Sequence, residues 1–274
     1  MKYTLRLDEK TYHLLKGVAR LRGASAVIAG VTLRLLLNCG KFLKDELNNL
    51  YYFREDEKRV YEVSDKSEEF EGLLYDLTGL NSKTQSLKEA VALRHGEEVS
   101  VYRDFHYDKE RGILYVYLQN GEYLTLDGEK VEIWPNGANG IYFTRNSLVE
   151  PLKYIPPKKR EKIEILRQIE EQRGDGNLFI QAVYNRTSYD PNSELSIRQQ
   201  RDLLALYYYS VPFGDFLTTV PILSLVGEKG SAKTTCVRFF GRMLYGTKFD
   251  VTSVDSNAQG ERDFVAMLAK IGHS

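Results

Sequence analysis

The sequence predicts an α+β multidomain protein, on three observations. Apolar residues recur at helical spacing in residues 1–48, short β-rich runs separated by turn residues fill 97–150, and an apolar run at 220–226 leads into a glycine-rich loop. A chain of 274 residues has room for two or three small domains or one large one. The composition shifts divide it into segments 1–48, 49–96, 97–150, 151–195 and 196–274.

The composition is that of a globular protein with balanced charge. Hydrophobic residues make up 42% and charged residues 28% of the chain, enough to bury a core. Lys plus Arg and Asp plus Glu number 38 each, so nucleic-acid contact would need a local basic patch. No apolar run approaches the roughly 20 residues of a membrane-spanning helix, and Cys39 and Cys236 match no metal-ligand spacing. We therefore expect a soluble, cytoplasmic protein without a membrane partner.

The first segment, 1–48, is predicted to be a small helical module that starts with a strand. Apolar and polar residues alternate over 2–7, as in a half-buried strand, and a helical pattern follows over 11–22. Ser25 is expected to cap a second helix. The residues expected to face inward on that helix are Val27, Ile28, Val31, Leu35 and Leu36.

This order of elements resembles the ribbon-helix-helix DNA-binding fold. The matching positions are Tyr3, Leu5 and Leu7, the helix 11–22, the turn Gly23-Ala24-Ser25 and the second helix to Leu37. In that fold two chains pair their strands into a ribbon in the major groove. The resemblance implies that Lys2, Thr4 and Arg6 face the bases. An ordinary docking subdomain remains the alternative, because any short amphipathic helix pair gives a similar pattern.

Residues 49–96 are predicted to form a small mixed αβ region. Two β-rich runs, 51–53 and 60–63, flank a charged turn and indicate a hairpin. Helical patterns follow over 70–77 and 86–93.

Residues 97–150 are predicted to form an antiparallel β-meander of about five strands. The expected strands are 99–102, 113–118, 123–126, 131–134 and 141–143. Turn signals separate them at Asn120-Gly121, Asp127-Gly128, Asn136-Gly137 and Asn139-Gly140. Residues 151–195 are expected to be a charged helical linker.

The last segment, 196–274, is predicted to place a glycine-rich loop between a strand and a helix. A helix over 196–210 comes first, and the apolar run 220–226 is typical of a strand buried on both faces. The helix after the loop is expected over 234–244. Its expected inward residues are Val237, Phe240, Met243 and Leu244.

The loop itself follows the pattern G-x-x-x-x-G-K-[ST], with Ala232 in place of the glycine before the lysine. A triphosphate is compact and strongly anionic, so a loop that binds it needs inward N–H groups and glycines that allow close approach. Lys233 would contact the β- and γ-phosphates, and the Thr234 hydroxyl would ligate Mg²⁺. The methyl group at 232 is tolerable if the backbone stays helical there. The candidate ATP-binding residues are Gly227, Glu228, Lys229, Gly230, Ser231, Ala232, Lys233, Thr234 and Thr235.

The segment 220–263 resembles P-loop ATPases of phages and mobile elements, which are similar to superfamily 3 and primase-associated helicases of the AAA+ class. The residues that carry the resemblance are Gly-Glu-Lys-Gly-Ser-Ala-Lys-Thr-Thr and the later Glu261-Arg262-Asp263. The runs 112–120, 133–137 and 142–145 are similar to the β-rich segment before that ATPase. The resemblance implies the start of an α/β P-loop NTPase core, with ATP and Mg²⁺ as cofactors, DNA as partner and assembly into a homo-oligomeric ring.

An ATPase core also needs a Walker B carboxylate, a sensor residue and usually an arginine finger. Asp250, Asp255 and Asp263 are the acids available, and Asp255 comes closest because it follows Val251-Thr-Ser-Val254. We expect instead that the Walker B strand lies beyond Ser274, that the catalytic residues are therefore unknown, and that turnover is low or absent.

Two other functions stay open. The chain could be a DNA-binding regulator that uses the ribbon-helix-helix-like segment and carries a vestigial P-loop, or a structural or interaction protein in which a glycine turn stands beside an exposed lysine.

Overall fold

The computed structural model describes residues 24–64, 66–78, 87, 96–147, 149–160, 163, 167, 187–217, 219 and 221–251. Helices and strands occur together in them, so the α+β class is confirmed. The chain divides into two compact units. Unit 1 contains Met1–Asp104, Gly121–Tyr123 and Glu132–Arg145, and unit 2 contains Phe105–Asn120, Leu124–Val131 and Asn146–Ser274.

Unit 1 contains a four-stranded sheet in the order β3-β2-β1-β4. Its strands are β1 (Gly40–Lys44), β2 (Leu50–Arg54), β3 (Arg59–Glu62) and β4 (Glu97–Glu98). The antiparallel pair β2–β3 is the predicted hairpin. β1 pairs antiparallel with β2 over five positions, from Gly40 opposite Arg54 to Lys44 opposite Leu50. The boundary drawn at residue 48 therefore falls between two paired strands of one sheet.

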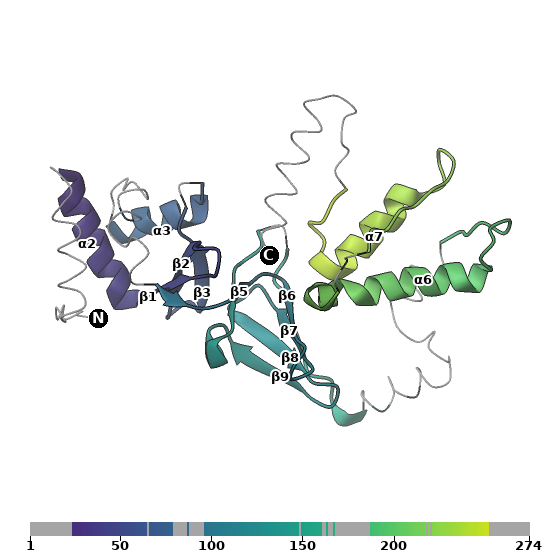
Figure 1. The fold of residues 1–274 in the computed structure, drawn as a ribbon, viewed down its shortest axis with the longest axis horizontal. Coiled ribbons are helices and arrows are strands. Elements are labelled where there is room, and N and C mark those ends of the chain that lie inside the picture. The colour runs from purple at the N-terminus through teal and green to yellow at the C-terminus, as the bar shows by residue number, and fades with distance from the viewer. Residues whose placement is uncertain are drawn as a thin grey trace. The chain divides into compact units, whose positions relative to one another are not determined.

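Helices α2 (Ala24–Cys39) and α3 (Glu68–Thr78) pack on this sheet, and α3 confirms the helix predicted at 70–77 (Figure 1). The buried Tyr52 ring lies between Phe42 and Phe70, and its hydroxyl donates a hydrogen bond to the carbonyl of Leu36 at 2.8 Å. The next residue, Phe53, is buried on the other side of the sheet with Leu43, Val60 and Tyr142. Both faces of β2 are covered, so its apolar run is continuous rather than alternating.

The inward face predicted for the second helix is wrong in part. Val27 and Val31 are 68% and 53% exposed, whereas Leu36 is buried as predicted, and Ala29, Thr32 and Leu33 are buried as well. Ser25, expected as the cap, lies inside α2. α2 carries apolar residues around much of its circumference, so helical spacing fitted two faces equally well and packing decided between them.

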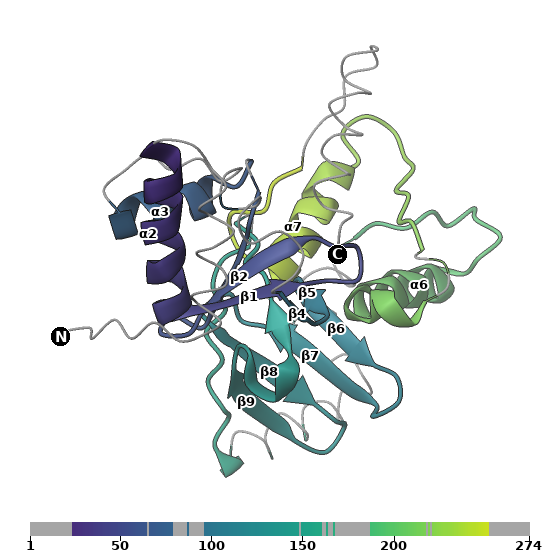
Figure 2. The same cartoon turned by 60° about the vertical axis from the view of Figure 1, so that its left-hand side comes forward.

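The meander differs from the prediction at both ends (Figure 2). It has four strands in the order β6-β7-β8-β9 rather than about five. They are β6 (Phe105–Asp108), β7 (Ile113–Tyr117), β8 (Glu122–Leu126) and β9 (Val131–Pro135). The strands predicted at 99–102 and 141–143 become β5 (Val101–Tyr102) and β10 (Tyr142–Phe143), which pair in parallel with each other. The sequence prediction missed β6, because Phe-His-Tyr-Asp is short and half-buried throughout.

In unit 2, helix α6 (Ile197–Ser210) confirms the prediction at 196–210. The Ser196 side chain accepts from the backbone N–H of Gln199, and the Gln199 side chain accepts from the N–H of Ser196, a complete capping box. The 3₁₀ segment η3 (Val211–Phe216) continues from α6. Tyr107 of β6 lies edge-on to the rings of Phe213 and Phe216 in η3.

Helix α7 (Lys233–Tyr245) confirms the helix predicted after the loop. Phe240 is buried against Leu204 of α6, and its ring lies 5.4 Å from Tyr207 and 5.0 Å from Tyr208. Met243 and Leu244 pack on the same cluster, as expected.

The strand predicted at 220–226 is wrong for its described residues, 221–226, which form no helix or strand. Ile222 and Val226 are 92% and 93% exposed instead of buried. An extended segment becomes a strand only when a neighbour pairs its N–H and C=O groups. No described strand pairs with this segment, and its apolar side chains are only partly covered: Leu223 packs on the cluster around Phe240, whereas Ile222 and Val226 stay exposed.

Several predictions concern residues outside the described part of the chain. These are the strand and first helix of the amino-terminal module with Lys2, Thr4 and Arg6, the helix 86–93 apart from Leu87, most of the charged helix in 151–195, and the acids Asp255 and Asp263. Within the described residues, no helix is long and apolar enough to cross a membrane.

Candidate functional site

The glycine-rich loop of residues 227–232 leads directly into α7. The carbonyl of Ala232 accepts a hydrogen bond from the N–H of Cys236 at 2.9 Å and so starts the helix. The first N–H groups of a helix have no partner within it, and the helix dipole adds positive potential at that end. The anchoring of α7 through Phe240 therefore fixes a set of N–H donors at the mouth of the loop.

The Lys233 side chain folds back across this loop. Its ammonium donates to the carbonyl of Gly227 at 2.6 Å, to the carbonyl of Glu228 at 2.7 Å and to the hydroxyl of Ser231 at 3.0 Å. An ammonium group has three N–H donors, so these three oxygens saturate it. The loop is thus closed around its own lysine, with the positive charge held inside the ring of backbone.

At two glycines of the loop a side chain would be unfavourable. Gly230 has φ +90°, a left-handed conformation that favours glycine. A Cβ atom on Gly227 would lie 2.9 Å from the hydroxyl oxygen of Ser231, so a side chain at 227 would displace a ligand of the lysine. One N–H of the loop, that of Ser231, is used internally by the carbonyl of Glu228 at 3.2 Å.

Ala232 departs from the sequence expectation. The expected tolerance of its methyl group required a helical backbone, but Ala232 has φ +57° and ψ +20°, in the left-handed region. The pattern contained a signal for this, because the residue usual at that position is glycine, the residue that adopts positive φ without strain.

The hydroxyl groups available for a metal lie in the first turn of α7. Thr234 and Thr235 are both exposed there. Mg²⁺ at nucleotide sites takes few protein ligands and completes its shell with phosphate and water oxygens. A single exposed threonine hydroxyl fits that role. Among the described residues, no group of three His, Cys, Asp or Glu side chains could hold an ion by itself.

Asp250 is the one Walker B candidate that the structure describes, and its carboxylate is engaged elsewhere. It accepts from Arg238 Nε at 2.7 Å and from the N–H of Val251 at 2.8 Å. The hydrogen bond from Arg238 is the main reason that the pKa of the Asp250 carboxyl lies below its usual range. The Phe249 ring occupies the space where Gly241 lacks a side chain, so the chain after α7 folds back along the helix.

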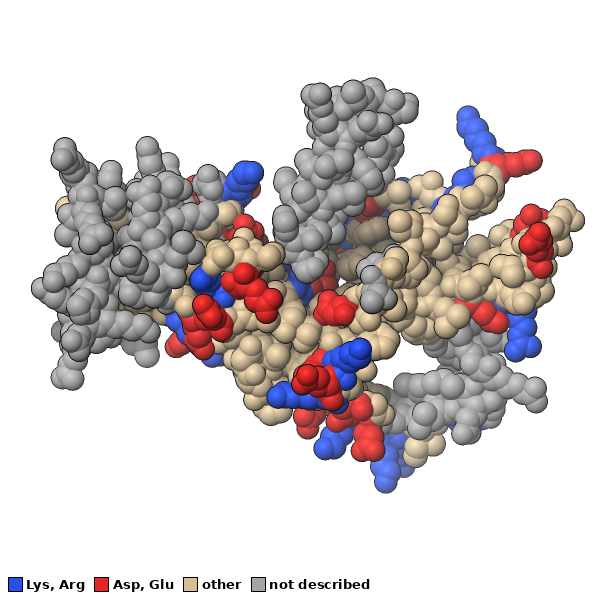
Figure 3. Space-filling model, viewed as in Figure 1, with Lys and Arg blue, Asp and Glu red and all other residues tan. Residues whose placement is uncertain are grey.

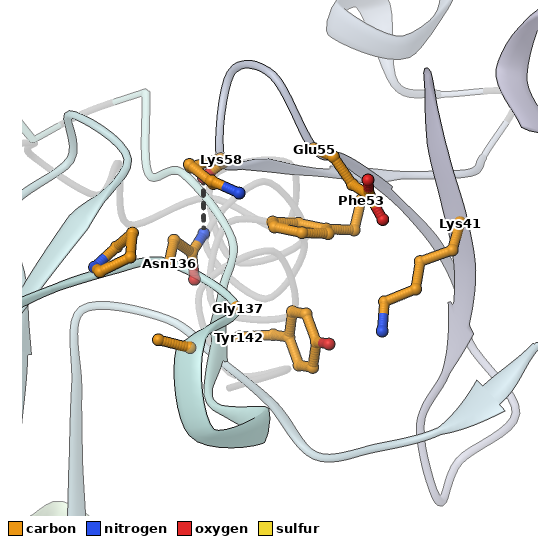
Figure 4. Close-up of a pocket in the computed structure, with 9 residues that line it drawn as sticks. Lys41, Phe53, Glu55, Lys58, Asn136, Gly137 and Tyr142 are labelled. Carbon is orange, nitrogen blue, oxygen red and sulfur yellow. Dashed lines mark hydrogen bonds between the residues drawn. The ribbon is translucent and has the colours of Figure 1, made fainter. Parts of the chain in front are cut away.

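Unit 1 contains a second candidate site, a pocket of about 360 Å³ (Figure 4). It is lined by Lys41, Phe53, Glu55, Lys58, Pro135, Asn136, Gly137, Ala138 and Tyr142. The Phe53 and Tyr142 rings meet edge to face at 5.2 Å, and the Lys41 ammonium lies 5.4 Å from the centre of the Tyr142 ring.

The chemistry of this pocket favours no particular ligand. Lys41 pairs with Glu97 at 2.6 Å, and Glu55 lines the same wall as Lys58, so the positive charges are balanced. Burial lowers the pKa of Lys41, but hydrogen bonds to Glu97 and Tyr142 outweigh burial and leave the pKa raised. The Asn136 side chain, the buried polar group in the wall, makes three hydrogen bonds to backbone groups. We therefore assign no ligand to the pocket.

The space-filling view of the described residues shows how charge is distributed on one face of the molecule. On the face drawn in Figure 3, basic and acidic side chains of the described residues are interspersed. No protein-family model, characterised protein or solved structure matches this chain.

Proposed function

We propose that this chain is the ATP-binding portion of a DNA helicase or replication-type ATPase of a phage or mobile element. It binds MgATP through residues 227–235. The observation that supports the proposal is the position of the Lys233 ammonium, inside a glycine-rich loop and at the first turn of a helix. On the resemblance to phage P-loop ATPases alone, DNA and further copies of the chain in a ring are its proposed partners.

Each residue has a defined task in this proposal. Lys233 would bind the β- and γ-phosphate oxygens through the ammonium donors that now bond to the loop. Backbone N–H groups between Lys229 and Lys233, other than the Ser231 N–H that bonds to Glu228, would bind the remaining phosphate oxygens. The Thr234 hydroxyl would ligate Mg²⁺, which would supply charge neutralisation. Because Asp250 is held by Arg238, the proposal covers binding of ATP and not its hydrolysis.

The test is a titration of the full chain with a fluorescent ATP analogue and Mg²⁺. Lys233→Ala is expected to abolish measurable binding, because the phosphates lose their principal positive partner. Lys248→Ala is the matched control, since Lys248 is an exposed lysine beyond the end of α7, and its removal should leave affinity within about twofold. Equal affinity of Lys233→Ala and the parent would remove the proposal.

A further inference from the structure

Strand β9 is an exposed edge of the meander sheet. It comes last in the order β6-β7-β8-β9, and no strand in the described part of the chain pairs with its outer side (Figure 2). All five of its residues are exposed, among them the large apolar residues Val131, Ile133 and Trp134. An open edge of this kind is a template for a further strand.

The hydrogen bonds to β8 determine which backbone groups of β9 point away from it. The N–H of Asp127 donates to the carbonyl of Lys130, and the N–H of Asn136 donates to the carbonyl of Gly121. Bonded positions alternate along an antiparallel ladder. The even-numbered residues of β9 therefore bond to β8, and the odd-numbered residues turn their N–H and C=O groups outward.

The outward groups belong to Val131, Ile133 and Pro135. A proline has no N–H to donate, so a further strand can exchange hydrogen bonds in both directions only with Val131 and Ile133. The part of the edge that can pair is thus its amino-terminal half, which follows the turn at 127–130.

We propose that this edge binds the same edge of a second copy of the chain, antiparallel, with the two Val131 residues opposite each other. In that register Lys130 of one copy lies opposite Glu132 of the other, and the reverse pair forms across the twofold axis. These are non-hydrogen-bonded positions, where opposite side chains come closest and opposite charges stabilise the pair. Both side chains are exposed. The edge is therefore complementary in charge to itself.

Charge and the proline disfavour the other alignments. A twofold axis at Glu132, or a parallel alignment in register, would put the two Glu132 carboxylates opposite each other, which is destabilising. An axis at Ile133 would bring Pro135 into the ladder and place Glu132 opposite Trp134, so a donor is lost and no ion pair forms. The register centred on Val131 is the one that uses both charges.

The contact is small, so the dimer should be weak and concentration-dependent. A single pair of short strands buries less than the roughly 1,200 Å² at the lower end of stable interfaces. A twofold contact closes on itself and yields a dimer, so a ring would need a different contact. Pairing through β9 does not depend on ATP binding by residues 227–235.

The test is sedimentation velocity of the full chain at low salt and without nucleotide, from about 10 μM to about 1 mM. A reversible dimer is expected, with a parallel change in the emission of Trp134, the one tryptophan of the chain. Lys130→Glu and Glu132→Lys should each raise the dissociation constant of the dimer at least tenfold, because each puts two like-charged pairs across the axis. The double variant restores both ion pairs and should return to within about threefold of the parent.

Two further variants complete the experiment. Lys66→Glu makes the same change in net charge at an exposed lysine outside β9 and should leave the dimer unchanged. Ile133→Pro removes an outward N–H without removing a bond to β8, so it should abolish the dimer while the far-ultraviolet circular dichroism stays that of the parent. A parent that is monomeric over the whole range would overturn the proposal. A dimer that survives both single charge reversals, or one that the double variant does not restore, would overturn it as well, and none of these results would affect the proposed binding of ATP.

Discussion

The core of unit 1 and the glycine-rich-loop region of unit 2 are packed very differently. In unit 1, Tyr52, Phe70 and Leu74 are fully buried between a sheet and two helices. In unit 2, α6 and α7 meet through a cluster whose buried members are Leu204 and Phe240, and the rest of that cluster is half-buried. The apolar segment before the loop is almost entirely exposed at Ile222 and Val226.

This difference separates two kinds of structural signal. Helices α6 and α7 form where helical spacing predicts them, and α6 also has a capping box, because these signals act within one or two turns. A buried strand requires partners on either side, and local sequence cannot supply them. The loop and α7 can therefore form while the segment before them belongs to no sheet.

Truncation of one phenylalanine in each unit tests this comparison, with the largest effect expected in unit 1. Phe70→Ala should cost about 3–5 kcal/mol, because a fully buried ring leaves a cavity that sheet and helices cannot fill. Phe240→Ala should cost roughly half as much, since half-buried neighbours can relax into the space. Hydrogen-exchange mass spectrometry of peptides from α3 and α7 measures the loss of stability in each unit.

Tyr75 in α3 is 60% exposed, so Tyr75→Ala controls for removing an aromatic residue from the same helix. It should change the free energy of opening, as measured by hydrogen exchange, by less than about 1 kcal/mol. A loss of stability for Phe240→Ala as large as that for Phe70→Ala would contradict this comparison. It would mean that α6 and α7 share a core as well packed as that of unit 1.

Substitution of Asn136 is expected to have the next largest effect on stability. Its amide nitrogen donates to the carbonyls of Lys58 and Phe143 at 3.1 and 2.9 Å, and its oxygen accepts from the N–H of Phe143 at 2.8 Å. Asn136→Ala removes two buried hydrogen bonds to the backbone of Phe143 and a part-buried one to the Lys58 carbonyl, and should cost about 2–3 kcal/mol of unit 1 stability. Urea unfolding followed by circular dichroism measures the loss.

Asn136→Asp refines this prediction, because a carboxylate keeps the acceptor and removes both donors. It should destabilise the unit as well, and more strongly as pH rises and the carboxyl group ionises. Asn192 is exposed, so Asn192→Ala should fall within about 0.5 kcal/mol of the parent. Unchanged stability of Asn136→Ala would show that these hydrogen bonds do not hold the β2–β3 turn to β10.

The turn at Asn136-Gly137 shows how much of the fold the sequence could predict. Its dipeptide predicted a turn, and Gly137 has φ +88° there. The pairing that follows the turn was not predictable, because β10 pairs in parallel with β5, about 40 residues earlier in the chain. Spacing and turn residues locate strands, whereas long-range pairing depends on which surfaces bury one another.

The candidate site shows the same limit at smaller scale. The pattern predicted that Lys233 lies at the end of a glycine-rich loop and that a helix follows, because both features depend on local sequence. It did not predict that Ser231 completes the ligands of the ammonium, or that Ala232 is left-handed. Both depend on how the loop closes in three dimensions.

The smallest predicted effect is a pH dependence at the end of α7, in unit 2. The Glu150 carboxylate accepts from the N–H of Thr247 at 2.9 Å and from its hydroxyl at 2.8 Å, and these bonds hold the pKa of Glu150 below its ordinary value of 4.5. A depressed folded-state pKa contributes stability above the unfolded value and loses it as pH falls through the folded value. Glu150→Gln should therefore be less stable than the parent at pH 6.5, and the gap in urea midpoint should close below about pH 4.5.

Thr247→Val removes the hydroxyl donor and keeps the N–H, so it should show a smaller gap with the same pH dependence. A gap that is constant from pH 6.5 to pH 3.5 would mean that Glu150 acts through packing and not through its charge. The end of α7 would then owe its position to apolar contacts, as the core of unit 1 does.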